Sequence, residues 1–105
     1  MGTAPRVDNG AMPQLPDAEI ATRLGRLPGW EREGDEIVRT FELPSFPEAI
    51  AFVGRVAERA EAANHHPDLD IRYRKVRVAL STHDEGGLTE RDFALATEID
   101  ATAEG

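Results

Sequence analysis

Three histidines are the residues in this sequence best suited to proton chemistry. His65 and His66 stand side by side directly before Pro67, and His83 stands in the stretch STHDEGG. An imidazole titrates near neutral pH, so it can both give and take protons there. Glu61 lies four residues before His65, which on a helix is one turn away on the same face. A carboxylate with paired imidazoles indicates general acid–base catalysis.

The histidine pair follows the clearest predicted helix, SFPEAIAFVGRVAERAEAAN. Ser45 and Glu48 have the spacing of a capping box, and Pro47 is tolerated in a first helical turn. Pro67 disfavours helical geometry at His66, so the helix is expected to end about there. Apolar residues recur at steps of three and four, which predicts one buried face. That face consists of Ala49, Phe52, Val53, Val56, Ala57 and Ala60.

A helix C-terminus favours a protonated imidazole, and a nearby carboxylate does the same while fixing the tautomer. His83 closes a predicted strand and opens a glycine-rich loop, a common place for functional groups on a rigid scaffold. Ser81, Thr82 and Asp84 would present their side chains or backbone groups together with it. Taken singly, each residue also fits a structural role, such as a helix cap or a first-turn carboxylate.

The rest of the chain predicts an α+β fold in the order α-β-β-α-β-β-α. A short helix capped by Asp17 precedes a hairpin, WEREGDEIVRTFEL, with its turn at Gly34 and Asp35. The segment IRYRKVRVALST is rich in strand formers, with a bulge or tight break near Arg74-Lys75. A last helix, LTERDFALATEID, takes Thr89 as its N-cap. Hairpin-like strand pairs predict a four-stranded antiparallel sheet with helices packed on one face.

Composition narrows the function further. The 105 residues suit one domain, with residues 1–15 as a disordered extension and 16–103 as the domain. A net charge of −8 disfavours nucleic-acid binding. The absence of cysteine excludes thiol nucleophiles and zinc–thiolate sites, and no apolar run approaches membrane-spanning length. We expect a soluble, cytoplasmic protein without a membrane or nucleic-acid partner.

A metal site is not expected from the histidines. Adjacent helical residues point about 100° apart, so His65 and His66 are poorly placed to share one ion. Histidines that share an ion on a helix are spaced three or four residues apart. The acid–base interpretation therefore needs neither a metal nor an organic cofactor.

The stretch EAANHHPDLDIRYRKVRVALSTHDEGGLTERDFALA resembles the signature of the pterin-4a-carbinolamine dehydratase family. That signature places an acid ahead of His-His-Pro, then an aromatic residue, a histidine and an aspartate. The corresponding residues here are Glu61, His65-His66-Pro67, Tyr73, His83 and Asp92. The resemblance covers roughly residues 17–101, including Gly29-Trp30. Asn64 and Leu69 depart from some members, but neither change touches an ionisable group of the histidine set.

The resemblance implies a hydro-lyase that removes water from 4a-hydroxytetrahydropterin and so regenerates the pterin cofactor of aromatic amino-acid hydroxylases. It implies acid–base catalysis by His65, His66 and His83, with Glu61 as an orienting carboxylate. The predicted pterin-binding residues are Trp30, Asn64, His65, His66, Pro67, Ser81, Thr82, His83, Asp84 and Asp92. Within that set, Trp30 is expected to close the pocket.

The resemblance also implies a homodimer or homotetramer. An alternative function is a pterin- or protein-binding module without catalysis, of the assembly or transcriptional co-factor type. Retention of Glu61 with all three histidines favours the dehydratase.

Overall fold

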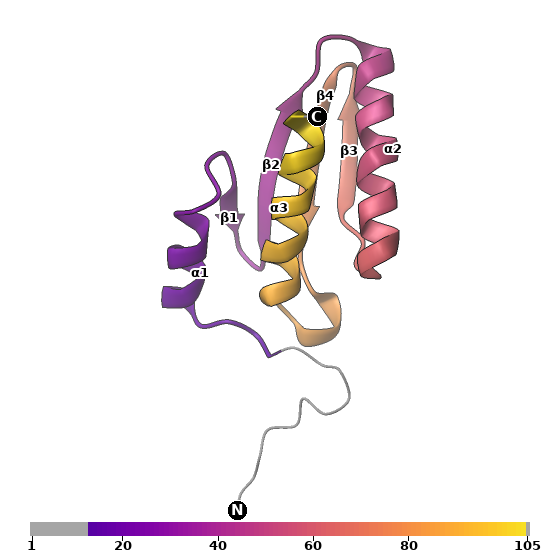
Figure 1. The fold of residues 1–105 in the computed structure, drawn as a ribbon. Coiled ribbons are helices and arrows are strands. Elements are labelled where there is room, and N and C mark those ends of the chain that lie inside the picture. The colour runs from indigo at the N-terminus through magenta and orange to yellow at the C-terminus, as the bar shows by residue number, and fades with distance from the viewer. Residues whose placement is uncertain (1–12, 105) are drawn as a thin grey trace, which may run out of the picture.

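The computed structural model describes residues 13–104 and has the α+β architecture expected from the sequence. Its elements are α1 (Asp17–Leu24), β1 (Glu31–Glu33), β2 (Glu36–Glu42), α2 (Phe46–Ala63), β3 (Asp68–Arg72), β4 (Lys75–Leu80), the 3-10 turn η1 (His83–Glu85) and α3 (Glu90–Glu104). The four strands form one antiparallel sheet in the order β1-β2-β4-β3. The helices pack on one face of this sheet (Figure 1). None of the described helices is long and apolar enough to cross a membrane.

Two tight hairpins set the register of the sheet. Gly34 and Asp35 connect β1 to β2 as expected, and Gly34 has a φ of 63°, which a glycine adopts without strain. The second hairpin turns at Tyr73 and Arg74, between the paired residues Arg72 and Lys75. The predicted break near Arg74-Lys75 is therefore a two-residue turn that begins at Tyr73. This turn explains why Ile71 and Val76 lie opposite each other on one face.

The core lies between the sheet and helices α2 and α3. Alternate residues of β4 point into it, and Val76, Val78 and Leu80 are fully buried. Phe52 of α2 packs on Phe41 of β2 with ring centroids 4.8 Å apart. Burial of one such side chain stabilises the fold by about 1.5–3 kcal/mol. Along α2, Ala49, Phe52, Val56 and Ala60 are buried and Val53 is half-buried, whereas Ala57 is exposed, contrary to prediction.

The helix starts agree with the sequence prediction for α2 and α3 but not for α1. The Ser45 hydroxyl accepts a hydrogen bond from the backbone N–H of Glu48 at 3.2 Å. The Thr89 hydroxyl likewise accepts from the backbone N–H of Arg91 at 3.2 Å. Asp17 lies inside the first turn of α1, where its carboxylate pairs with Arg32 at 2.9 Å instead of capping the helix.

Gln14 and Leu15, which the sequence analysis assigns to the extension, contact the rest of the domain. The Gln14 amide donates to the backbone oxygen of Glu85 at 2.6 Å, and the backbone N–H of Leu15 donates to Leu88 at 2.9 Å. The Leu15 side chain also packs against the core. The remaining part of the predicted extension, residues 1–12, lies outside the described residues. Gln14 and Leu15 thus fasten the loop that carries His83.

Removing these contacts is expected to loosen that loop. Deletion of residues 2–15 should speed amide hydrogen exchange in residues 83–88 by at least about tenfold, since two hydrogen bonds to this loop are lost, each worth about 0.5–1.5 kcal/mol. Deletion of residues 2–12 is the matched control, because it spares both contacts. Equal exchange in the two truncated proteins would show that Gln14 and Leu15 do not hold the loop.

Candidate active site

A left-handed residue, Asn64, separates the end of α2 from the two adjacent histidines. The helix ends at Ala63, and Asn64 follows with φ 52° and ψ 44°. Asparagine tolerates this conformation better than most residues, which suits it to a helix C-terminus. The backbone N–H of His65 then closes the helix by donating to Ala60 at 3.0 Å. His65 and His66 therefore lie beyond the helix, one directed inward and the other outward.

The inward ring, His65, is held by the buried carboxylate of Asp92. Its Nε2 lies 2.6 Å from Asp92 Oδ1, and both side chains are almost fully buried. The other oxygen, Oδ2, accepts from the Thr82 hydroxyl at 2.8 Å and from the Thr89 backbone N–H at 3.0 Å. An ionised carboxylate can only accept hydrogen bonds, so with Asp92 ionised the 2.6 Å contact assigns a proton to Nε2 of His65.

The outward ring, His66, pairs with Glu61 instead. Its Nε2 lies 2.6 Å from Glu61 Oε2, and 57% of the His66 side chain is exposed. The predicted pairing of Glu61 with His65 is therefore wrong. That prediction assumed helical spacing through residue 65, and the left-handed turn at Asn64 breaks this spacing. Two different acids thus orient the two histidines.

The third histidine is presented by a short closed loop. The chain leaves β4 at Leu80, and the backbone N–H of Thr82 donates to Gly87 at 3.0 Å, which draws the loop ends together. His83 begins the 3-10 turn, and Gly86 ends it with a φ of 77°. His83 and Asp84 are both exposed, while Thr82 is buried beneath them.

A hollow of about 200 Å³ forms where these segments meet, beside the ends of α2 and β4 and the start of α3. It is lined by Asn64, His65, His66, Ser81, Thr82, His83, Asp84 and Arg91. All three histidines therefore contribute to one cavity. Of the other predicted residues, Glu61 and Asp92 contact His66 and His65, and Pro67 and Trp30 do not line the hollow.

Arg91 is the lining residue that the sequence interpretation missed. Its guanidinium donates to the backbone oxygen of Asn64 at 2.7 Å, so it joins the start of α3 to the turn before His65. The available signal was its place directly before Asp92 in the TERD stretch. A residue in that place is expected near the start of α3, but the sequence does not indicate that α2 ends beside it.

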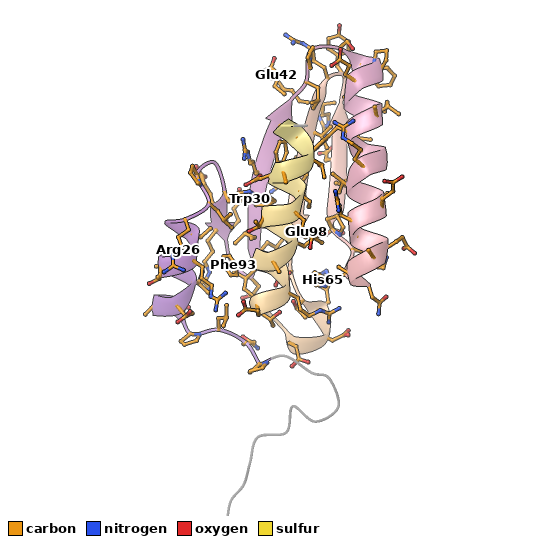
Figure 2. All side chains as sticks on the ribbon, viewed as in Figure 1. Arg26, Trp30, Glu42, His65, Phe93 and Glu98 are labelled. Atoms are coloured by element: carbon orange, nitrogen blue, oxygen red, sulfur yellow. The ribbon has the colours of Figure 1, made fainter. Side chains whose placement is uncertain are left out.

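Trp30 lies in the core away from the hollow, contrary to its expected role of closing the pocket. Its ring packs edge-on against Phe41 with centroids 6.2 Å apart, and its Nε1 donates to Asp100 of α3 at 3.0 Å. Figure 2 shows Trp30 beside β2 and His65 below the C-terminal end of α2. Within one chain, Trp30 therefore supports the fold rather than the site.

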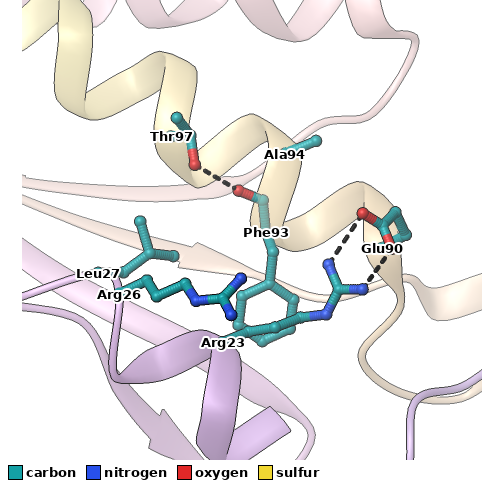
Figure 3. A pocket seen from close by; sticks show the side chains of 7 residues that line it. All are labelled: Arg23, Arg26, Leu27, Glu90, Phe93, Ala94 and Thr97. Carbon is teal, nitrogen blue, oxygen red and sulfur yellow. Dashed lines mark hydrogen bonds and ion pairs between the residues drawn. The ribbon is translucent and has the colours of Figure 1, made fainter. Parts of the chain in front are cut away.

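A second hollow, of about 210 Å³, lies between α1 and α3 (Figure 3). On one wall the Arg23 guanidinium contacts both oxygens of Glu90, at 2.8 and 2.7 Å. This hydrogen bond is the main cause that raises the pKa of Arg23 above its ordinary value, with a smaller contribution from Glu19. The lining residues include no histidine. The ion pair therefore anchors the first turn of α3, which carries Asp92, and all three histidines lie at the other hollow.

The histidines are not arranged as ligands of a single metal ion. His65 and His66 each direct Nε2 to a different carboxylate. Among residues 13–104, no group of three or more histidine, aspartate or glutamate side chains is placed to hold an ion.

Comparisons with known proteins agree on one family. The family model described as "Pterin 4 alpha carbinolamine dehydratase" matches residues 13–102 of this chain. Proteins named "Putative pterin-4-alpha-carbinolamine dehydratase" from Roseiflexus sp. (strain RS-1) and Chloroflexus aurantiacus are 67% and 65% identical. The aligned regions cover 83% and 85% of this chain and 94% and 96% of those proteins.

Two solved structures are similar. The transcriptional coactivator/pterin dehydratase from Brucella melitensis is 35% identical, with a TM-score of 0.83 over 86% of this chain and 98% of that one. A pterin dehydratase-like RuBisCO assembly factor of the α-carboxysome is 23% identical. Its TM-score of 0.58, over 70% of this chain and 86% of that one, shows a shared fold alone. By sequence and by fold, this chain belongs to the pterin 4 alpha carbinolamine dehydratase family.

Proposed function

We propose that this protein converts 4a-hydroxytetrahydropterin to quinonoid dihydropterin and water. The C4a–O bond breaks, a proton is delivered to the departing hydroxyl, and the N5 proton is removed, so one water leaves and the new C=N bond forms. The physiological role is regeneration of the pterin cofactor of aromatic amino-acid hydroxylases in the cytoplasm. Family membership and the geometry of the histidine hollow support this proposal.

The observation that carries the proposal is that two of the three imidazoles are exposed at the hollow and the third is buried. His66 and His83 are exposed at the hollow, so both can exchange protons with a bound substrate and with water. His65 is buried and fixed by Asp92, which suits it to orient the substrate. We assign the proton donated to the hydroxyl and the proton taken from N5 to the pair His66 and His83. Positioned transfer of this kind is typically worth about 10²–10⁴-fold in rate.

The remaining lining groups suit the polar edge of a pterin. Asn64 and Asp84 are exposed, and Ser81 and Thr82 add hydroxyl and backbone groups. The pterin amide and amino groups need both donors and acceptors, which this mixture supplies. We propose that these residues hold the pterin ring while the histidines act on C4a and N5.

The direct test is a stopped-flow dehydration assay. A hydroxylase generates 4a-hydroxytetrahydropterin, and the absorbance of the quinonoid product is followed with and without this protein. We expect the protein to accelerate product formation over the spontaneous reaction. A rate equal to the spontaneous one, at protein concentrations in excess of substrate, would refute dehydratase activity.

A binding module is the second candidate, favoured by one surface. Phe46 and Ile50, four residues apart on α2, are 46% and 42% exposed. Exposed apolar side chains that adjoin on one helix face are typical of protein contacts. We propose that this surface joins copies of the chain as a homodimer or homotetramer. In a binding module without catalysis, the same surface would instead contact a different protein. The stopped-flow assay distinguishes the dehydratase from such a module, because only the dehydratase accelerates product formation.

Metal independence is a further expectation. If His66 and His83 transfer protons directly, exhaustive chelation should leave turnover within about twofold of the untreated rate, because each imidazole then supplies its share of catalysis unaided. The purified protein should contain no stoichiometric zinc or iron by elemental analysis. One ion per chain, with turnover lost on chelation and restored by that ion, would replace direct proton transfer by a metal-assisted reaction.

A further inference from the structure

The loop that carries His83 is held in place by a single hydrogen bond from another segment. Its internal backbone bonds, such as the 2.9 Å donation from Glu85 to Thr82, set the shape of the loop. They do not fix the loop against the rest of the molecule. Among the described residues, the one hydrogen bond that reaches residues 83–86 from outside the loop is the donation by the Gln14 amide to the backbone oxygen of Glu85, at 2.6 Å.

Two adjacent glycines let the Gln14 amide lie against this loop. Gly86 has a φ of 77°, so its backbone conformation alone favours glycine. Gly87 has no positive φ, yet a Cβ atom there would lie 2.8 Å from Oε1 of Gln14. A side chain at Gly87 therefore cannot be accommodated while the amide keeps its place. The close approach of Gln14 accounts for the second glycine of the pair.

The backbone that follows Gln14 is fastened to the core. The N–H of Leu15 donates to the backbone oxygen of Leu88 at 2.9 Å, and the Leu15 side chain packs against the core that contains Leu88. Figure 1 shows this segment passing below the loop between β4 and α3. Gln14 therefore joins a fixed segment to a loop that is otherwise free to shift. Without that contact, two glycines in succession allow the loop many backbone conformations.

We propose that Gln14 is a positioning residue for the dehydration, which holds His83 at the hollow by fixing the loop that carries it. This inference rests on the proposed function, in which His83 exchanges a proton with the substrate. A proton-transfer group must lie within hydrogen-bond distance of the reacting atom, and a displacement of about 1 Å is costly in rate. Gln14 does not line the hollow, so it acts through His83 rather than on the substrate.

The contact itself is tested by hydrogen exchange, without any turnover. Gln14→Ala should speed exchange of the 85–86 amides about fivefold, as for the loss of one exposed hydrogen bond. Gly87→Ala should do the same, because its methyl group displaces the end of a flexible side chain. The two substitutions together should add little to either alone. Thr22→Val is the matched control, since it removes one exposed bond to a backbone oxygen of α1. Unchanged exchange in Gln14→Ala, or fully additive effects, would overturn the contact.

The catalytic role is tested by a double-mutant cycle in the stopped-flow assay. Gln14→Ala should lower kcat about fivefold, while its melting temperature changes no more than that of Thr22→Val. In the His83→Ala background, the same substitution should change the remaining rate less than about twofold, because the group that Gln14 positions is gone. An equal loss in both backgrounds would show that Gln14 does not act through His83. Unchanged kcat in Gln14→Ala would equally overturn the proposal.

Failure of the proposed function is distinguishable from failure of this inference. If the wild-type protein shows no dehydration, the proposed function fails, and the same cycle is measured in the Kd of biopterin by fluorescence polarisation. Weaker binding in Gln14→Ala that disappears in the His83→Ala background would still support the positioning of His83. Equal effects in both backgrounds, or no binding by the wild-type protein, would overturn it.

Discussion

Replacement of His66 or His83 by alanine is expected to slow dehydration at least about tenfold while the protein stays folded. Both rings are exposed at the hollow, so little packing is lost with either. The substrate also loses water slowly without a catalyst, which places the effect at the lower end of the range for positioned proton transfer. The measurement is the stopped-flow rate per folded molecule, together with the melting temperature of each variant.

The Glu61→Gln variant is the matched control for His66. It keeps a hydrogen-bonding group 2.6 Å from Nε2 but removes the negative charge. A drop in rate with unchanged melting temperature would show that the carboxylate acts through the imidazole.

If His66 and His83 served only as structural caps, the alanine variants would lose stability and keep their turnover. Stability would then fall by about 0.5–2 kcal/mol, as for a lost cap, and turnover would hold. Normal turnover in both alanine variants would rule out the proposed mechanism.

The fold was predictable because its local signals agree with one another. The Ser45 cap of α2, the Gly34-Asp35 turn and the Thr89 cap of α3 all occur where short-range patterns place them. The errors are also local. Asp17 was assigned as a cap but lies inside the first turn, because the chain enters α1 through the extended residue Pro16. Short-range sequence patterns do not locate the first residue of a helix to within one residue.

The sequence predicts that the three histidines lie close together, but not which carboxylates they contact. His65, His66 and His83 do meet at one hollow. The carboxylate partners were misassigned because one left-handed residue, Asn64, redirects the chain after α2. The partner of His65 comes from α3, 27 residues away, and spacing along the sequence carries no information about that contact. The position of Trp30 was missed for the same reason, since it depends on Asp100 near the C-terminus.

Asp92→Ala is expected to destabilise the protein by about 3 kcal/mol, because three buried donors lose their acceptor at once. These donors are Nε2 of His65, the Thr82 hydroxyl and the Thr89 backbone N–H. Asp92 has no exposed surface, so water cannot replace the carboxylate without entering the core. For a domain of this size the melting temperature should fall by roughly 12–24 °C. Chemical denaturation of the two proteins, compared at equal ionic strength, measures the difference directly.

Asp92→Asn separates the structural part of this role from the catalytic part. An asparagine oxygen can still accept from Thr82 and Thr89, but its amide group would then face Nε2 of His65 as a donor. The proton of His65 must therefore move to Nδ1, which reverses the tautomer while most of the packing remains. We expect a folded protein with reduced turnover, and the ¹⁵N chemical shifts of His65 should report the exchanged tautomer. Thr82→Val is the matched control for stability alone, since it removes one donor to Asp92 without touching His65, and its melting temperature gives the cost of that lost hydrogen bond. Wild-type turnover in Asp92→Asn, with the tautomer shown to be reversed, would mean that the orientation of His65 does not matter for the reaction.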